Sequence, residues 1–209
     1  MQQTPPPRTA TRYDLGFTGS TLRLDRLLVV ARAMLAGDDR DLTDELGNGK
    51  MATGRRMLIE LKKRLGTLTL DQLSLLVHGD LRSQKQLALL AVCKAYPFIR
   101  DFILEVVREK ALVFDMQLTD GEYLTFARRK TDLHPELEYV TPITLNKMRQ
   151  VVIKVLAQSG LVDNVRSKVI QQQVLAPDLV RCIRADSPDW LKLYLVKDRD
   201  IHPTTTVTP

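Results

Sequence analysis

The sequence has few of the residues from which enzymes build reactive centres. Its 209 residues include only two cysteines and three histidines, and none of them have the spacing of a metal site. A phosphate loop, a dinucleotide-binding glycine motif and a nucleophile elbow are also absent from the sequence. Acidic residues gather at 41–45 and 136–138, where solvated charge explains them better than metal ligation does. We therefore expect neither enzymatic activity nor a cofactor.

Long apolar runs are missing as well. The richest one, residues 87–99, is interrupted by Lys94 and Pro97 and is too short to cross a bilayer. The first twelve residues contain three consecutive prolines and no apolar core, which is unlike a signal peptide. Both cysteines, Cys93 and Cys182, lie in apolar helical patterns, as expected of buried thiols in a reducing compartment. Together these features predict a cytoplasmic protein without membrane insertion.

What the sequence does have is helical periodicity along most of its length. Residues that cap helices, among them Thr69, Asp80, Thr119 and Thr141, precede apolar residues repeating every three to four positions. Ser20 or Thr21 is expected to cap the first helix in the same way. The pattern predicts an all-α fold of two packed helical lobes, which contain helix-turn-helix and winged-helix-like units.

The predicted divisions of the chain follow from its prolines, glycines and polar ends. They are a flexible arm (1–14), a first lobe (15–96), a second lobe (97–196) and a flexible tail (197–209). The last helix of the second lobe is expected to begin at Ser187–Pro188. Short β-branched pieces separated by polar residues predict a small β-hairpin near 161–174.

The first basic segment has the order of a helix-turn-helix unit. Residues 41–47 predict a short helix that ends in a glycine turn, and a second helix begins near Thr53 and ends at Gly66. The formal charge of +6 favours an anionic partner. A solvated charged face is the alternative interpretation of this helix. The residues expected to contact phosphate are Lys50, Arg55, Arg56, Lys62 and Lys63.

A second basic helix is predicted from Pro142 to Ser159. Amides and lysines on its exposed face suit contacts with bases and phosphates, and Ile153 is expected beside that face. The hairpin that follows would form the wing of a winged helix, unless it only closes the domain. The residues expected to bind here are Asn146, Lys147, Gln150 and Lys154 on the helix, and Arg166 and Lys168 on the hairpin.

Several helical segments share their pattern with a known family. They are residues 73–81, 84–90, 97–102, 105–110 and 144–161, the last of which runs into Ser-Gly-Leu-Val. Over residues 15–185 the chain resembles the BrxA family, a small component of the bacterial BREX anti-phage defence system. The resemblance implies an all-α protein with helix-turn-helix features that lacks enzymatic activity and binds duplex DNA. Members of this family are also described as similar to an RNA-binding antitermination factor and as inner-membrane proteins.

These observations together predict a function in nucleic-acid binding. We expect a non-enzymatic accessory protein of BREX that binds double-stranded DNA largely irrespective of sequence, through phosphate contacts, beside other BREX proteins. One alternative is an RNA-binding protein of the antitermination type. Another is a scaffold whose exposed apolar residues, such as Ile59 and Ile153, contact other BREX proteins. Charge and spacing leave DNA and RNA equally open, and the preference for DNA follows from the resemblance.

Overall fold

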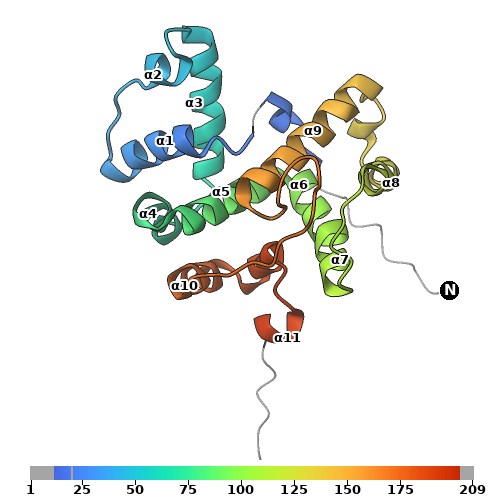
Figure 1. Cartoon of the computed structure of the whole chain (residues 1–209). Coiled ribbons are helices and arrows are strands. Elements are labelled where there is room, and N and C mark those ends of the chain that lie inside the picture. The colour runs from blue at the N-terminus through green and yellow to red at the C-terminus, as the bar shows by residue number, and fades with distance from the viewer. Residues whose placement is uncertain (1–11, 20, 203–209) are drawn as a thin grey trace, which may run out of the picture.

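The computed structural model describes residues 12–19 and 21–202, which form eleven α-helices and no sheet (Figure 1). The predicted all-α class is therefore confirmed for this part of the chain. The α-helices are α1 (Leu24–Ala36), α2 (Thr43–Gly47), α3 (Met51–Leu65), α4 (Leu70–His78), α5 (Leu81–Ala95), α6 (Pro97–Phe102), α7 (Arg108–Leu112), α8 (Asp120–Thr131), α9 (Pro142–Ser159), α10 (Pro177–Asp186) and α11 (Asp198–Ile201). The other helical segments are the 3₁₀ turns η1 (Gly16–Gly19), η3 (Pro135–Leu137) and η4 (Pro188–Tyr194), and the π-helical segment η2 (Ile103–Val107).

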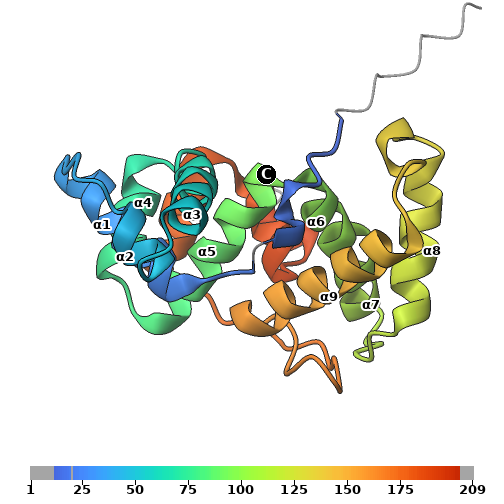
Figure 2. The ribbon, with the colours of Figure 1, turned by 90° about the horizontal axis from the view of Figure 1, so that it is seen from above.

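Helix α5 runs through the centre of the molecule. Figure 2 shows α1–α4 at one end and α7–α9 at the other, with α5 between them. Every residue of α5 from Leu87 to Cys93 is buried, because α5 packs against α3, α4, α6 and α9. Buried residues from both sides of the predicted boundary at 96–97 belong to one hydrophobic core. The burial of large apolar side chains in such a core supplies most of the stability of a domain.

Capping explains where several helices begin and end. The side chains of Thr69, Asp80, Thr119 and Thr141 accept hydrogen bonds from backbone N–H groups in the first turns of α4, α5, α8 and α9. These four predicted caps are confirmed, and each satisfies an N–H group that has no partner within its helix. Helix α9 ends at Gly160, whose φ of 79° lies in the left-handed region that glycine adopts without strain.

The start of α1 differs from the expectation. The helix begins at Leu24, after Arg23 at φ 50°, and no side chain caps it. Thr21 is not the cap because its segment is held by other helices: the carbonyl oxygen of Thr21 accepts a hydrogen bond from Arg64 (2.7 Å), and the N–H of Leu22 donates to Gln158 (2.9 Å). Ser20, the other predicted cap, lies outside the described residues.

Tertiary contacts also order the ends of the described chain. Tyr13, in the segment predicted as an arm, is 4% exposed and stacks on His134 with ring centroids 3.7 Å apart. In the predicted tail, α11 buries Ile201, and Arg184 donates hydrogen bonds to the carbonyl oxygens of Asp200 and Ile201. Both segments are ordered because a few side chains fix them to the core. The rest of the predicted arm and tail, residues 1–11 and 203–209, lies outside the described residues.

Two further elements differ in type. The segment from Pro188 is the 3₁₀ turn η4 and not the predicted α-helix, although Tyr194 at its end is buried in the core. The sequence from Pro97 to about Phe114 is typical of one long helix; the structure has a continuous helical run over 97–112 that contains the π-helical segment η2.

Candidate nucleic-acid interface

Helices α2 and α3 pack backbone against backbone. The chain turns between them at Asn48 and Gly49, which both have positive φ (48° and 81°). A Cβ atom on Gly54, in the first turn of α3, would overlap the carbonyl oxygen of Thr43 and lie 2.8 Å from its carbonyl carbon. Only glycine therefore fits at position 54. Gly54 belongs to no motif of the sequence, although a glycine inside a helical pattern often marks such a close approach.

Arg26 of α1 holds this turn in place. Its guanidinium donates hydrogen bonds to the carbonyl oxygen of Glu45 (2.6 Å) and to the side-chain oxygen of Asn48 (2.8 Å). The arginine thereby satisfies acceptors at the C-terminal end of α2, where a cation also interacts well with the helix dipole. Nothing in the sequence pattern linked Arg26 to the turn, because the contact joins residues about twenty positions apart.

The basic residues predicted on α3 are exposed, but they are not equivalent. Lys50, Arg55, Arg56 and Lys62 project into solvent. Lys63 is also exposed, yet it forms an ion pair with Asp14 and lies 4.5 Å from the centroid of the Tyr96 ring. An ammonium that already has a carboxylate partner gains less from a phosphate than a solvated one does. Lys63 is thus the weakest candidate of the five.

An acidic residue also tempers the charge of Arg55 and Lys62. Hydrogen bonds from Thr43 lower the pKa of Asp41, and the positive charges of Arg55 and Lys62 add to this lowering. Asp41 is therefore ionised at neutral pH and sits in the field of the two cations. Among residues 12–19 and 21–202, no carboxylate lies within ion-pair distance of either one.

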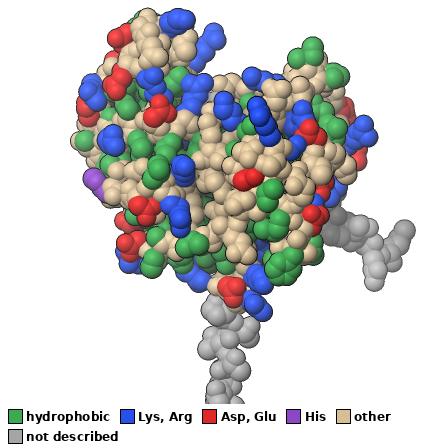
Figure 3. All heavy atoms as spheres, viewed as in Figure 1, with side chains coloured by type: hydrophobic (Ala, Val, Ile, Leu, Met, Phe, Trp, Pro, Cys, Tyr) green, Lys and Arg blue, Asp and Glu red, His purple; other side chains and the backbone are tan. Residues whose placement is uncertain are grey.

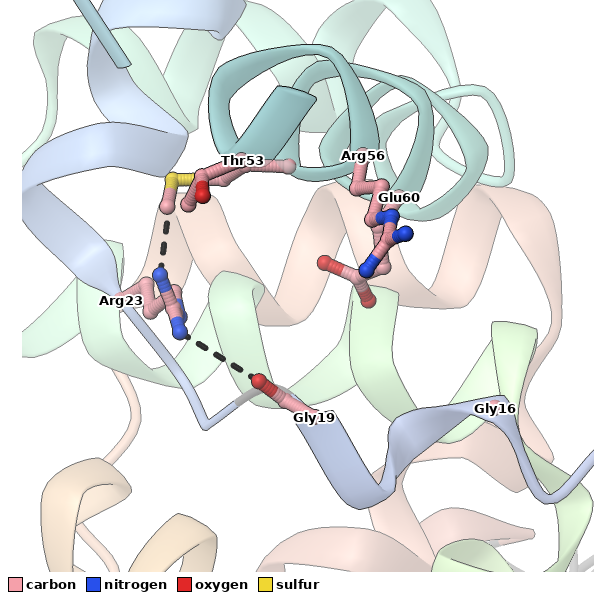
Figure 4. Close-up of a pocket in the computed structure, with 7 residues that line it drawn as sticks. Gly16, Gly19, Arg23, Thr53, Arg56 and Glu60 are labelled. Carbon is pink, nitrogen blue, oxygen red and sulfur yellow. Dashed lines mark hydrogen bonds between the residues drawn. The ribbon is translucent and has the colours of Figure 1, made fainter. Parts of the chain in front are cut away.

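A hollow of about 410 Å³ lies between η1, α3 and the segment that leads into α1 (Figure 4). Arg56 lines it together with Arg23, whose guanidinium donates to the carbonyl oxygen of Gly19 (3.3 Å) and approaches the sulfur of Met57 (3.5 Å). Glu60 also lines the hollow, and its carboxylate points into it (Figure 4). A second arginine, Arg23, which was not among the predicted phosphate contacts, therefore lines the same hollow as Arg56.

Helix α9 presents the second basic face. Asn146, Lys147, Gln150 and Lys154 are all exposed, as predicted, and the 18 residues of α9 include no acidic residue. Ile153 is only 6% exposed, so its predicted role as an exposed contact is wrong. It lies on the side of α9 that the segment 163–168 covers, where Ile153 and Val165 line a common hollow of about 360 Å³.

The segment after α9 folds back on itself without forming strands. Its pairing consists of isolated antiparallel bridges, Val162 with Ile170 and Val169 with Gln117. The predicted hairpin near 161–174 is therefore wrong in its strands, although the chain does reverse there. The reversal is built from side-chain bonds: Asp163 accepts from the N–H of Val169 (2.8 Å), and Asn164 accepts from the N–H of Arg166 (2.8 Å). This leaves Arg166 exposed at the tip.

Lys168 is not the free cation that the sequence suggested. Its ammonium lies 2.7 Å from Asp120, at the start of α8, and the same carboxylate forms an ion pair with Arg149 of α9. Hydrogen bonding from Lys168 lowers the pKa of Asp120, and Arg149 adds to the effect against some desolvation. Asp120 thus neutralises two cations at the edge of the α9 face, and neither partner could be found from sequence spacing.

Figure 3 shows where Lys and Arg side chains lie on one face of the molecule. Several Lys and Arg side chains lie along the upper part of the face shown, from the N-terminal end of α3 to α9. Between the two helices lies η1, which contacts α9. The described residues contain no group of three metal-ligating side chains. No helix among them is long and apolar enough to span a membrane.

Comparison of the sequence with known proteins identifies the family of the chain. A sequence model of the BrxA family matches residues 11–187. The chain belongs to the BrxA family. The BREX protein BrxA of Escherichia coli O9:H4 (strain HS) is 29% identical over 126 residues, which are 60% of this chain and 59% of that protein. The BREX protein BrxA of Bacillus cereus (strain H3081.97) is 29% identical over 109 residues, 52% of this chain and 54% of that protein.

The alignments with these two BrxA proteins span little more than half of each relative's length. A solved structure shares the fold over more of the chain. The crystal structure of an uncharacterized protein from Magnetospirillum magneticum superposes with a TM-score of 0.76 at 18% identity, covering 88% of this chain and 98% of that one. The likeness shows that the helical arrangement recurs in another protein.

Proposed function

We propose that this chain is a non-enzymatic accessory protein of a BREX anti-phage system that binds double-stranded DNA through α3 and α9, largely irrespective of sequence. One observation carries the proposal: two helices each expose a row of cations that have no carboxylate within ion-pair distance among the described residues. They are Lys50, Arg55 and Lys62 before and on α3, and Lys147 and Lys154 on α9. Membership of the BrxA family supports the place in BREX.

The expected chemistry is that of phosphate binding. Solvated lysines and arginines on an exposed helix face release the counterions of duplex DNA when they bind its phosphates. If the five cations above, Arg56 and Arg166 each met one phosphate, the slope of log affinity against log salt would be roughly −6. Affinity would then fall on the order of a thousandfold between about 50 and 200 mM salt.

A titration of a fluorescent duplex at these two salt concentrations tests the proposal directly. We expect tight binding at low salt, a steep loss at high salt and little difference between duplexes of unrelated sequence. Absence of binding to any duplex at low salt would contradict it. Competition between the labelled duplex and an unlabelled structured RNA of equal length tests the RNA-binding alternative. A protein that prefers RNA would release the duplex at a low concentration of RNA.

A further inference from the structure

One stripe of α9 combines three kinds of side chain. Ile143, Lys147, Gln150 and Lys154 follow one another at intervals of four, three and four residues, which places them on one line along a helix. All four are exposed. The isoleucine is 84% exposed, whereas Val151, Val152, Val155 and Leu156 of the same helix are buried. A surface that lies along the whole stripe covers Ile143 together with the two lysines.

The polar member of the stripe is free to bind. The amide of Gln150 makes no hydrogen bond within the described part of the chain, and it lines the hollow between α9 and the segment 163–168. A glutamine amide can donate a hydrogen bond to N7 of adenine and accept one from its N6 amino group at the same time. Asn146 is less suited to this role, because its side-chain oxygen already accepts a hydrogen bond from Arg149 (2.8 Å).

The stripe is long enough to reach more than one base pair of duplex DNA. Seven residues separate Ile143 from Gln150, about 10 Å along a helix axis, which is the rise of about three base pairs. The major groove admits an α-helix, and helices that enter it contact base edges with their N-terminal residues. Ile143 is the second residue of α9, so it stands at the end of the helix that would reach the bases.

We propose that α9 lies in the major groove and favours A·T pairs, with Ile143 against thymine methyl groups and Gln150 against adenine. The inference rests on the proposed function and adds a base preference to it. Lys147 and Lys154 of the same stripe contact the flanking phosphates. The preference is modest beside the phosphate contacts, because one buried methyl group changes affinity only about fourfold.

Duplexes that differ by single atoms or groups test the two contacts. The first comparison uses an A·T-rich duplex in which A·T and T·A pairs alternate irregularly. The second duplex has the same sequence but contains deoxyuridine, which lacks the methyl group of thymidine. Anisotropy titrations should give about fourfold weaker binding to the uridine duplex. Ile143→Ala should remove this difference. Ile59→Ala is the matched control: Ile59 is 64% exposed on α3, and its loss should leave the difference intact.

The second comparison replaces adenine with 7-deazaadenine, which lacks the N7 acceptor. The parent protein should bind this duplex less tightly, and Gln150→Ala should bind both duplexes equally. Equal affinity of the parent for the thymidine and uridine duplexes would overturn the inference while leaving the proposed function in place. So would a thymidine preference that survives in Ile143→Ala. Failure to bind every duplex at low salt would instead overturn the proposed function.

Discussion

The basic faces of α3 and α9 differ in how the rest of the protein treats their charges. On α3, Asp14 pairs with Lys63, and Asp41 lies in the field of Arg55 and Lys62. Helix α9 has no acidic residue of its own, and Asp120 of α8 reaches only Arg149 at its edge. The face with more positive charge in the sequence is therefore the one with more internal neutralisation.

The number of basic residues on a helix face does not alone determine how strongly that face binds phosphates. An ion pair that already exists must be broken, or left in place unused, when a phosphate arrives. A solvated lysine has only its hydration and counterions to exchange. We therefore expect each exposed lysine of α9 to contribute at least as much to binding as an exposed cation of α3, even though α3 carries more of them.

The largest expected effect is a loss of stability when the close packing of α2 on α3 is disrupted. Gly54→Ala places a methyl group on the carbonyl of Thr43, so α2 must move away from α3 at a cost of about 3 kcal/mol, despite the better helix propensity of alanine. Chemical denaturation measures the loss. Gly121→Ala is the control, because a Cβ atom there would meet only the Thr119 hydroxyl at 3.8 Å. Equal stability of the two variants would contradict the close approach of α2 and α3.

Charge reversal on each face should weaken DNA binding by about tenfold or more. One variant carries Arg55→Glu with Lys62→Glu, and the other carries Lys147→Glu with Lys154→Glu. Each pair removes two phosphate contacts, so the salt slope should fall by about two in either case. Salt-dependent titrations provide both quantities. If one pair left the slope unchanged, that helix would not be part of the interface.

Removing Asp120 should strengthen binding about threefold, because it frees two cations beside the α9 face. Asp120→Asn keeps the shape of the side chain and removes its charge from Lys168 and Arg149. Stability should fall at the same time by no more than about 1 kcal/mol, since the ion pairs are partly solvated. DNA titration and chemical denaturation of the same preparation test whether binding becomes stronger while stability falls. Weaker binding would mean that Asp120 positions the cations and does not compete for them.

Lys63→Ala should change DNA affinity less than twofold, and less than Arg56→Ala does, because Asp14 already neutralises Lys63. Anisotropy titrations of both variants under one buffer condition make the comparison. A loss for Lys63→Ala as large as that for Arg56→Ala would show that the ion pair opens when DNA binds.

The same ion pair predicts a small dependence of stability on pH. Burial raises the pKa of Asp14, but hydrogen bonds from Lys63 and from the N–H of Gly16 outweigh it, so the pKa is lowered overall. The carboxylate therefore stabilises the fold above its unfolded pKa of about 3.9, and this contribution is lost as the pH falls through the folded pKa. Asp14→Asn should be less stable than the parent at pH 7, by no more than about 1 kcal/mol. The difference should shrink in denaturation curves below pH 4.

Local features of the sequence predicted local structure. The caps at Thr69, Asp80, Thr119 and Thr141 were predictable because a capping side chain bonds to a residue three positions along. The start of α1 was not, because contacts with Arg64 and Gln158 draw residues 21–22 away from capping. The strands expected near 161–174 were replaced by a loop of Asp163 and Asn164 side-chain bonds, which hydrophobic periodicity does not encode.

Prediction of the candidate site has the same limit. The periodicity of α9 correctly exposed Asn146, Lys147, Gln150 and Lys154, since a helix face follows from spacing alone. It also placed Ile153 in solvent, because nothing local shows that the segment 163–168 returns to cover it. The partners of Lys63 and Lys168 lie 49 and 48 residues away. Spacing finds the charges on a face, and only the tertiary structure shows which are already paired.

The contacts of Tyr13 and Leu22 have a consequence for how the chain acquires its structure. Their partners His134, Glu136 and Gln158 are more than 120 residues further along the chain. At a synthesis rate of about 5–20 residues per second, residues 13–22 wait roughly ten seconds for their binding surface to leave the ribosome. Loop closure over such a separation is slow compared with helix formation. Residues 13–22 therefore dock only after residues 134–158 have been made.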